Sequence, residues 1–178
     1  SCCCTSINDG EVPTLSALWD ANDDGLLDNI TDYQFNNSLT SRISMDGVDI
    51  GSSGDMLAAF VDDELRGIAP EYPVTFGPNE GSIFFLILIY SNISSGETVT
   101  FKFYDAETDL VYNIDETYTF QADDPQGNLF TPFEFTTGDI DSSYGGENQQ
   151  ACDCDGNIDA DDDGICDGDD DCVGEYDE

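Results

Sequence analysis

The chain of 178 residues contains no histidine and only 3 basic residues, against 40 acidic ones, so its formal charge is −37. Phosphate binding requires lysine or arginine, which excludes nucleic acid as a partner. An anionic membrane surface is excluded for the same reason, unless calcium bridges the two. Without histidine, and without a Gly-x-Ser-x-Gly motif or a lysine-bearing phosphate loop, no enzymatic activity is expected.

Cysteine is absent from the centre of the chain, and no run of 18 apolar residues could span a membrane. Seven cysteines lie near the ends: Cys2, Cys3, Cys4, Cys152, Cys154, Cys166 and Cys172. This distribution is typical of disulfide staples in proteins outside the cell. Thiolate binding of a soft metal is less suitable, because the usual Cys-x-x-Cys spacing is missing. The start has no basic segment followed by an apolar run, so we expect a mature exported protein whose targeting segment was removed.

Two disulfide arrangements are compatible with the positions of the cysteines. Adjacent cysteines rarely bond to each other because the short ring is strained, so the first three are expected to reach the other end. The arm of one subunit bonds the tail of the next in a head-to-tail filament, or both ends of one chain are clasped together. Because seven is odd, at least one cysteine is free or pairs with another molecule.

Residues 159–170 match a calcium-binding loop. Such a loop supplies oxygen ligands at fixed positions and needs a glycine at position 6, where the chain turns sharply. Gly164 stands at that position. The candidate ligands are the side chains of Asp159, Asp161, Asp163, Asp167 and Asp170 and the carbonyl of Ile165. The competing interpretation is a solvated acidic turn.

A shorter version of the same pattern lies near the start of the chain. The candidate ligands are the side chains of Asp20, Asn22, Asp24 and Asp28 and the carbonyl of Leu26, with Gly25 at position 6. Position 12 is Thr31, with Asp32 beside it, so the closing ligand is less well defined than in the second loop. Bound divalent cations would offset the self-repulsion of so acidic a chain.

Between about residues 33 and 137 the chain alternates strands with turns. We expect strands at 32–36, 38–45, 55–61, 72–76, 82–91, 98–105, 110–114, 116–122 and 129–136. Val99, Phe101 and Phe103 alternate with polar residues, which predicts a half-buried strand. Residues 82–90 have no polar face, so this strand is expected to be central and covered on both faces, or covered by a partner chain.

These strands predict an all-β fold, an antiparallel β-sandwich of immunoglobulin-like or jelly-roll-like type, with a partly closed barrel as the alternative. We divide the chain into a cysteine arm (1–15), a sandwich carrying the first calcium loop (16–137), a linker (138–150) and an irregular segment (151–178). Calcium and disulfides are expected to hold the last segment in place of a hydrophobic core.

Two stretches resemble known families. Asp159–Cys172, with Cys152-Asp-Cys-Asp-Gly before it, resembles thrombospondin type-3 repeats and, more closely, the Asp/Cys-rich repeats of bacterial surface proteins with type IX secretion anchors. The resemblance implies backbone wrapped around calcium and pinned by disulfides. Gly54-Asp-Met-Leu-Ala-Ala-Phe-Val61, Glu64-Leu-Arg-Gly67 and Gly96–Asp105 resemble a module of the same surface proteins, which implies a structural use without assigned catalysis.

Several polar residues have a structural and a functional interpretation. Arg66 is expected to pair with a carboxylate as a structural clamp, the alternative being a ligand carboxylate. Three glycosylation sequons begin at Asn29, Asn36 and Asn92, near predicted strand ends or turns.

The sequence therefore predicts an extracellular or cell-surface structural protein that binds calcium. Our leading form is a homopolymer subunit of a fibre, with head-to-tail contacts and no direct membrane insertion. An adhesin or carbohydrate-binding module with a glycan or cell-surface ligand is the second hypothesis, which an exposed aromatic platform would favour. A hydrolase using paired carboxylates is the third.

Overall fold

The computed structural model describes residues 19–144, and these form an all-β fold. The elements are a short 3-10 helix η2 (Ile30–Asp32) and strands β1 (Phe35–Met45), β2 (Val48–Asp49), β3 (Met56–Val61), β4 (Glu64–Pro73), β5 (Ile83–Ser91), β6 (Ser95–Asp105), β7 (Leu110–Ile114), β8 (Tyr118–Gln121) and β9 (Phe133–Ile140). The all-β prediction is confirmed. The linker from residue 145, the cysteine arm and the acidic C-terminal segment lie outside the described residues.

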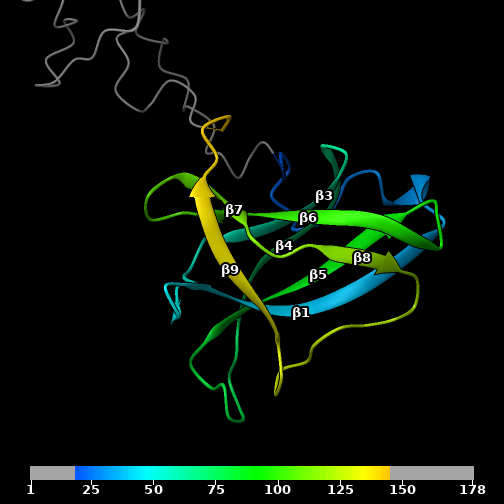
Figure 1. Cartoon of the computed structure of the whole chain (residues 1–178). Helices are drawn as coiled ribbons and strands as arrows, with labels where there is room; N and C mark the ends of the chain where they lie inside the picture. The colour runs from blue at the N-terminus through cyan, green and yellow to red at the C-terminus, as the bar shows by residue number, and fades with distance from the viewer. Residues whose placement is uncertain (1–18, 145–178) are drawn as a thin grey trace, which may run out of the picture. The chain divides into compact units, whose positions relative to one another are not determined.

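The sheet closes on itself. Strands follow one another in the order β1, β5, β4, β3, β6, β7 and β9, and β9 returns to pair with β1. Figure 1 shows β9 rising past β1 and then running up beside β7. The short β2 pairs antiparallel with the end of β1, and β8 pairs with the first part of β6. The closed path is a barrel of seven strands, and a two-sheet sandwich is not confirmed.

Two long strands form the corners of this barrel. β4 pairs with β3 along most of its length and with β5 only through Glu71–Pro73. β9 pairs with β1 through Phe133–Thr136 and with β7 beyond that point. The pairings between named strands are antiparallel except β1 with β9, which is parallel. A strand that changes partners midway turns the sheet through a corner.

The barrel interior is filled by alternate residues of the strands. On β6, Val99, Phe101 and Phe103 are buried, whereas Thr98 and Thr100 are exposed, so the predicted alternation is confirmed. Aromatic rings pack across the interior, with Phe101 and Phe135 centroids 4.5 Å apart. The inward residues of β5 join the same core. Burial of these side chains is the main favourable term for the fold.

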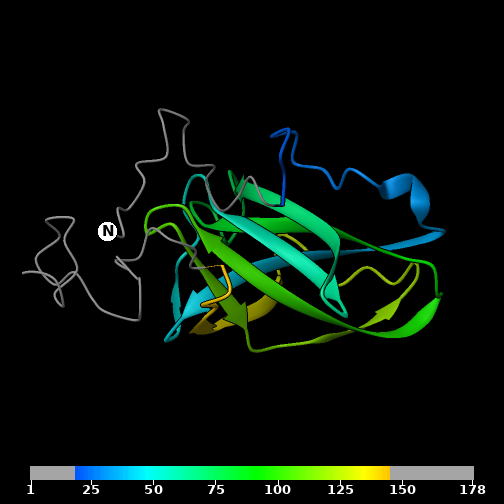
Figure 2. The same cartoon turned by 90° about the horizontal axis from the view of Figure 1, so that it is seen from above.

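A second apolar cluster lies on the outside of β3, β4, β6 and β7. Its buried members are Trp19, Met56, Ala58, Phe60, Ile68, Tyr104 and Val111. Trp19 belongs to the segment that precedes β1, which runs along the outer side of the barrel (Figure 2). Tyr144, just after β9, packs on the same cluster. Segments at both ends of the described chain therefore cover one outer face.

Within residues 19–144, the outer face of β5 is only partly covered. Leu86 and Leu88 are 43% and 42% exposed, while Phe85, Ile87 and Ile89 point into the core. The predicted cover is present on the inner face of the strand, and the described residues leave these two leucines partly exposed on the outer face. Coverage by a partner chain stays a prediction.

Candidate functional site

The first predicted calcium loop, residues 20–28, is a compact turn fixed to the barrel, and we call it the aspartate loop. Asp20 is buried, and its carboxylate accepts hydrogen bonds from the backbone N–H groups of Asp24 (3.2 Å) and Gly25 (2.7 Å). Gly25 has φ of +73°, a conformation that glycine adopts without strain. The sharp turn predicted at this glycine is confirmed.

The polar side chains of the loop point toward one another. The Asn22 side-chain nitrogen donates to Asp24 (3.2 Å) and to Asp28 (3.0 Å). The Asn22 oxygen accepts from the Asp24 backbone N–H at 3.2 Å. The Leu26 N–H donates to the Asp24 carboxylate at 2.9 Å. Four of the predicted ligand side chains, Asp20, Asn22, Asp24 and Asp28, are thus joined in one hydrogen-bonded network.

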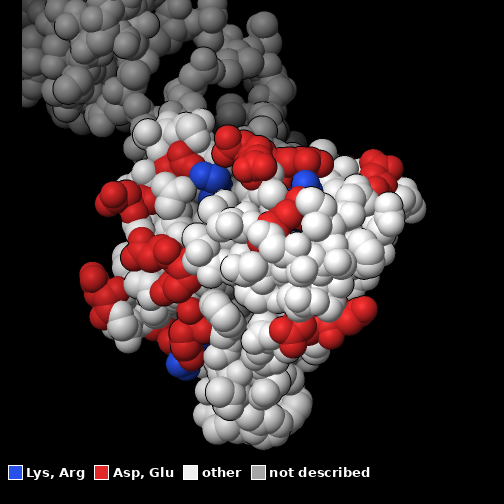
Figure 3. All heavy atoms as spheres, turned by 45° about the vertical axis from the view of Figure 1, so that its right-hand side comes forward, with Lys and Arg blue, Asp and Glu red and all other residues white. Residues whose placement is uncertain are grey.

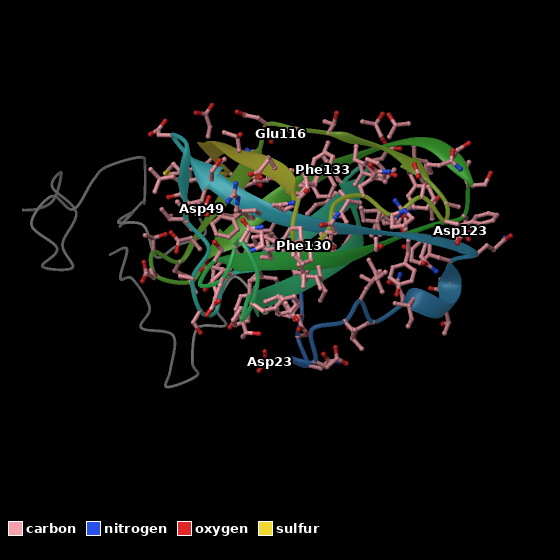
Figure 4. All side chains as sticks on the ribbon, turned by 90° about the horizontal axis from the view of Figure 1, so that it is seen from below. Asp23, Asp49, Glu116, Asp123, Phe130 and Phe133 are labelled. Atoms are coloured by element: carbon pink, nitrogen blue, oxygen red, sulfur yellow. The ribbon has the colours of Figure 1, made fainter. Side chains whose placement is uncertain are left out.

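This donor set has the chemistry that calcium prefers. Its side chains offer carboxylate and amide oxygens, and calcium takes six to eight oxygen ligands. The Asn22 nitrogen now lies between two carboxylates, and rotation of the amide by half a turn would present its oxygen there instead. Asp23 is not part of the network: it lies at the tip of the loop in Figure 4, with φ of +56°.

As the side chains stand, the part of the chain from 19 to 144 contains no group of three or more Asp, Glu, Cys or His side chains placed to hold a metal ion. Thr31, at position 12, belongs to η2 (Ile30–Asp32). The tight turn predicted at Gly25 is therefore present, whereas the closing ligand at position 12 stays a prediction. Calcium binding stays a prediction.

The loop is anchored to the barrel by apolar contacts. Leu27 is buried, and Gly25, Leu26 and Leu27 line a groove of about 70 Å³ against β4 and β5. The other lining residues are Ile68, Pro70, Leu86, Leu88 and Tyr90. A side chain at position 25 would meet the Pro70 ring at 3.2 Å, so the loop approaches β4 closely. Sequence reasoning did not find this groove, because it joins residues distant in the chain.

The predicted loop at 159–170 and all seven cysteines lie outside the described residues. Its candidate ligands Asp159, Asp161, Asp163, Ile165, Asp167 and Asp170 therefore stay predictions, as do the disulfides.

All three basic residues of the chain are already paired with acids. Arg42 contacts Glu134 at 2.9 Å and Asp49 at 3.3 Å. Lys102 pairs with Asp141 and also bonds Asn113. Figure 3 shows acidic side chains along the rims of one face, around a broad uncharged area. The remaining acids of the barrel have no basic side chain left to neutralise them.

Arg66 is the structural clamp that the sequence predicts. Its guanidinium contacts Glu64 at 3.2 Å and Glu97 at 3.6 Å, and donates to the Tyr90 carbonyl at 3.3 Å. It also lies over the Tyr33 ring, 5.1 Å from the centroid. The hydrogen bond from Tyr33, followed by the charge of Arg66, lowers the pKa of Glu64. This cluster ties β4, β5, β6 and the segment before β1 together.

Asp55 is a buried acid that the sequence analysis did not single out. Burial raises the pKa of this carboxyl, although it accepts bonds from the backbone N–H groups of Ala106 (2.9 Å) and Ser52 (2.6 Å). Asp55 thus joins the loop before β3 to the turn after β6. At Asp141, burial would raise the pKa, but the hydrogen bonds from Lys102 and Ser143 outweigh it and lower the pKa.

The three sequon asparagines gather at one end of the barrel, and all three are exposed. Asn92 donates to the Asp32 carbonyl and accepts from the Gln34 N–H. Asn36 lies opposite Tyr90 in the β1–β5 pair. Asn29 donates weakly to Tyr33 at 3.5 Å. This clustering could not be read from their spacing in the chain.

A pair of exposed aromatic rings lies on two neighbouring loops. Phe76 and Phe130 are 52% and 61% exposed, and their centroids are 6.4 Å apart with an interplanar angle of 67°. The Asn79 side chain donates to the Leu129 and Phe130 carbonyls and joins the two loops. The rings meet edge to face and do not form a flat platform.

Comparisons of the chain with models of protein families, with curated proteins and with solved structures give no match. Within residues 19–144, no helix is long and apolar enough to cross a membrane. The resemblances noted in the sequence therefore stay predictions.

Proposed function

We propose that this protein is an extracellular, calcium-binding structural protein, a self-assembling subunit of a surface fibre or filament linked by calcium and disulfides. The observation that supports it best is the aspartate loop. Its four polar side chains form one oxygen-rich network, seated on a rigid barrel by Trp19 and Leu27.

The charge of the chain favours the same function. With a net charge of −37 and its three cations already paired, the protein carries a large uncompensated repulsion. A divalent cation at each acidic loop reduces that repulsion. At a free calcium concentration 100 times the dissociation constant, each site would add about 2.7 kcal/mol of stability.

The finer description of the fold is part of this proposal. Two sheets packed as an antiparallel sandwich of immunoglobulin or jelly-roll type would share β4 and β9 as corner strands. The change of partner midway along each of these strands supports that description.

Calorimetric titration of the full chain with calcium tests the proposal. The double substitution of Asp24 and Asp28 by asparagine should weaken the N-terminal site at least about tenfold, because two charged ligands are lost. Asp123→Asn is the matched control, since Asp123 lies in another turn (Figure 4) and should leave binding unchanged.

Asp161→Asn with Asp163→Asn separates the second predicted site from the first. Each double variant should weaken one binding step and leave the other unchanged. Electron microscopy of the native material with and without a chelator tests assembly. The proposal fails if the unaltered chain takes up no calcium, or if chelation leaves filaments and protease resistance unchanged.

An adhesin or carbohydrate-binding module is the second candidate function. The exposed Phe76–Phe130 pair favours it, because aromatic rings contribute much of the binding energy at recognition sites. Binding of the monomeric protein to a glycan array, lost in Phe130→Ala, would support this alternative over the structural one.

A further inference from the structure

The only lysine of the chain lies where three neighbouring strands come together. Lys102 belongs to β6, and its direct partner on the antiparallel strand β7 is Asn113. Asp141 follows the last residue of β9, the next strand in the sheet order (Figure 1). The Lys102 ammonium donates to the Asn113 side-chain oxygen at 3.0 Å and pairs with the Asp141 carboxylate. An amine, an amide carbonyl and a carboxylate therefore meet at one nitrogen atom.

This meeting point is largely shielded from water. The Lys102 and Asp141 side chains are only 19% and 12% exposed. The Lys102 nitrogen lies 5.8 Å from the centre of the Phe60 ring and 5.4 Å from that of the Tyr144 ring. The Asp141 N–H donates to the Val111 carbonyl of β7 at 2.8 Å, which holds Asp141 in place. Groups that are fixed side by side and screened from water react far more readily than the same groups in solution.

We propose that the side chains of Lys102 and Asn113 react with each other to form an amide bond between β6 and β7, with Asp141 as the base. The three residues supply all the groups that such a reaction requires: a nucleophile, an electrophile and a proton carrier in contact with the nucleophile. The ion pair between Lys102 and Asp141 is the arrangement before the reaction.

The proposed reaction exchanges one amide for another and needs no oxidant. Asp141 accepts a proton from the Lys102 ammonium, and the neutral amine attacks the Cγ carbon of Asn113. Asp141 then gives that proton to the amide nitrogen of Asn113, which leaves as ammonia when its C–N bond breaks. The attacking nitrogen loses a second proton, which the ammonia takes up to become ammonium. One alkylammonium and one primary amide thus become one secondary amide and one ammonium ion.

The charge of Asp141 favours its role as the base over the role of electrophile. Burial alone would raise the pKa of this carboxyl, but the hydrogen bonds from Lys102 and Ser143 outweigh it and lower the pKa. An ionised carboxylate resists attack by an amine, whereas the Asn113 amide is neutral. A pocket of about 330 Å³ beside Lys102, lined also by Ser143 and Tyr144, gives the released ammonia a way out.

The consequence is a covalent tie inside the barrel that goes beyond the proposed function. The bond needs neither calcium nor cysteine, and neither a chelator nor a reductant would break it. It would keep β6 and β7 joined even where the hydrogen bonds between them are lost.

The mass of the full chain tests the proposal. The folded chain is incubated, then reduced and unfolded so that disulfides do not contribute, and its mass should be lower than that of its sequence by one ammonia. Because Lys102 is the only lysine, trypsin should not cleave after it and reductive methylation should not modify it. A full mass with a methylated Lys102 would overturn the proposal. Loss of one water instead would also overturn it, because Asp141 would then be the electrophile.

Substitutions assign the roles of the individual residues. Asn113→Ala should keep its full mass, because the electrophile is gone. Asp141→Ala should slow the reaction at least about a hundredfold, the usual contribution of a positioned base. The matched control is Asp139→Ala, which removes an exposed carboxylate two residues earlier and should react like the wild type. Fluorescence of the buried Trp19 checks that each variant is folded. Equal rates in the two aspartate variants would overturn the role of Asp141.

The same mass measurement with EDTA and dithiothreitol present throughout separates this bond from the proposed function. The loss of ammonia should persist under these conditions. Calcium uptake without the mass loss would leave the proposed function standing and remove the amide bond. Mass loss in a chain that takes up no calcium would do the reverse.

Discussion

Replacing Gly67 by alanine would force β4 away from β5 and open the barrel at a corner. An added Cβ would lie 2.2 Å from the Leu88 carbonyl oxygen and 3.1 Å from its carbon. Carbon atoms in contact prefer about 3.5–4.0 Å, so the two strands would have to separate by roughly 1 Å. Both partners are backbone atoms in a closed sheet, so a side-chain rotation cannot relieve the clash.

The magnitude follows from this displacement. Overpacking in a well-packed core costs about 1–3 kcal/mol. The neighbouring Arg66 donates to the Tyr90 carbonyl of β5, the strand that also carries Leu88. Loss of that hydrogen bond adds about 1 kcal/mol. We therefore expect Gly67→Ala to lower the free energy of unfolding by about 2–4 kcal/mol in total.

Urea unfolding followed by fluorescence measures this loss, because Trp19 is the single tryptophan and is buried against the barrel. Gly138→Ala is the matched control. Its added Cβ would meet the Asp115 carboxylate at 2.5 Å, the end of an exposed side chain that turns aside, so the cost should stay below about 1 kcal/mol. Equal losses in both variants, or none at Gly67, would refute the corner argument.

Three further predictions concern other parts of the barrel. Burial raises the pKa of Asp55 in the folded state, so protonation of this carboxyl stabilises the fold. That stabilisation is complete below the usual pKa of 3.8 and is lost as the pH rises through the folded-state pKa. Urea unfolding at a series of pH values should show this loss in the wild type and not in Asp55→Asn. Arg66→Met should lower the free energy of unfolding by about 2 kcal/mol, because it leaves Glu97, which is only 16% exposed, without its partner. Arg42→Met removes a more exposed ion pair and should cost less than about 1 kcal/mol in the same assay. Leu86→Ser with Leu88→Ser should change the unfolding free energy by less than about 1 kcal/mol but reduce self-association in sedimentation, and a large loss of stability without change in association would contradict a partner on this face.

Strands that read as a continuous run of apolar residues between turn signals could be predicted from the sequence. Residues 110–114 form β7 as expected, and the predicted strands at 55–61 and 82–91 differ from β3 and β5 by a residue at one end. In these segments the local residue pattern agrees with the burial in the fold, so the sequence of each segment is enough to predict the strand.

Strand β4 (Glu64–Pro73) was mostly missed, because Arg66, Gly67 and two prolines look like a turn. In the structure, Gly67 is needed for the close approach to β5, and Arg66 is stabilised by acids from other strands. The break predicted between 36 and 38 is also absent: β1 continues through Asn37, whose buried amide donates to the Tyr118 hydroxyl at 2.8 Å. Both errors arise from partners distant in the chain.

The candidate site shows the same division. The turn at Gly25 and the gathering of the aspartate loop follow from spacing, because all the groups lie within nine residues. The barrel closure, the groove beside Leu26 and the meeting of Trp19 with Tyr144 depend on contacts between segments far apart. No local pattern encodes such contacts.

The parallel pairing of β1 with β9 determines how the barrel responds to tension. Ser41 to Ser44 lie beside Phe133 to Thr136 in the same direction. When the chain is pulled by its two ends, these strands are drawn in opposite directions along their own axes. The hydrogen bonds between them are then loaded in shear and must break together, instead of one after another. A thread built from such units would resist stretching well beyond what its equilibrium stability suggests.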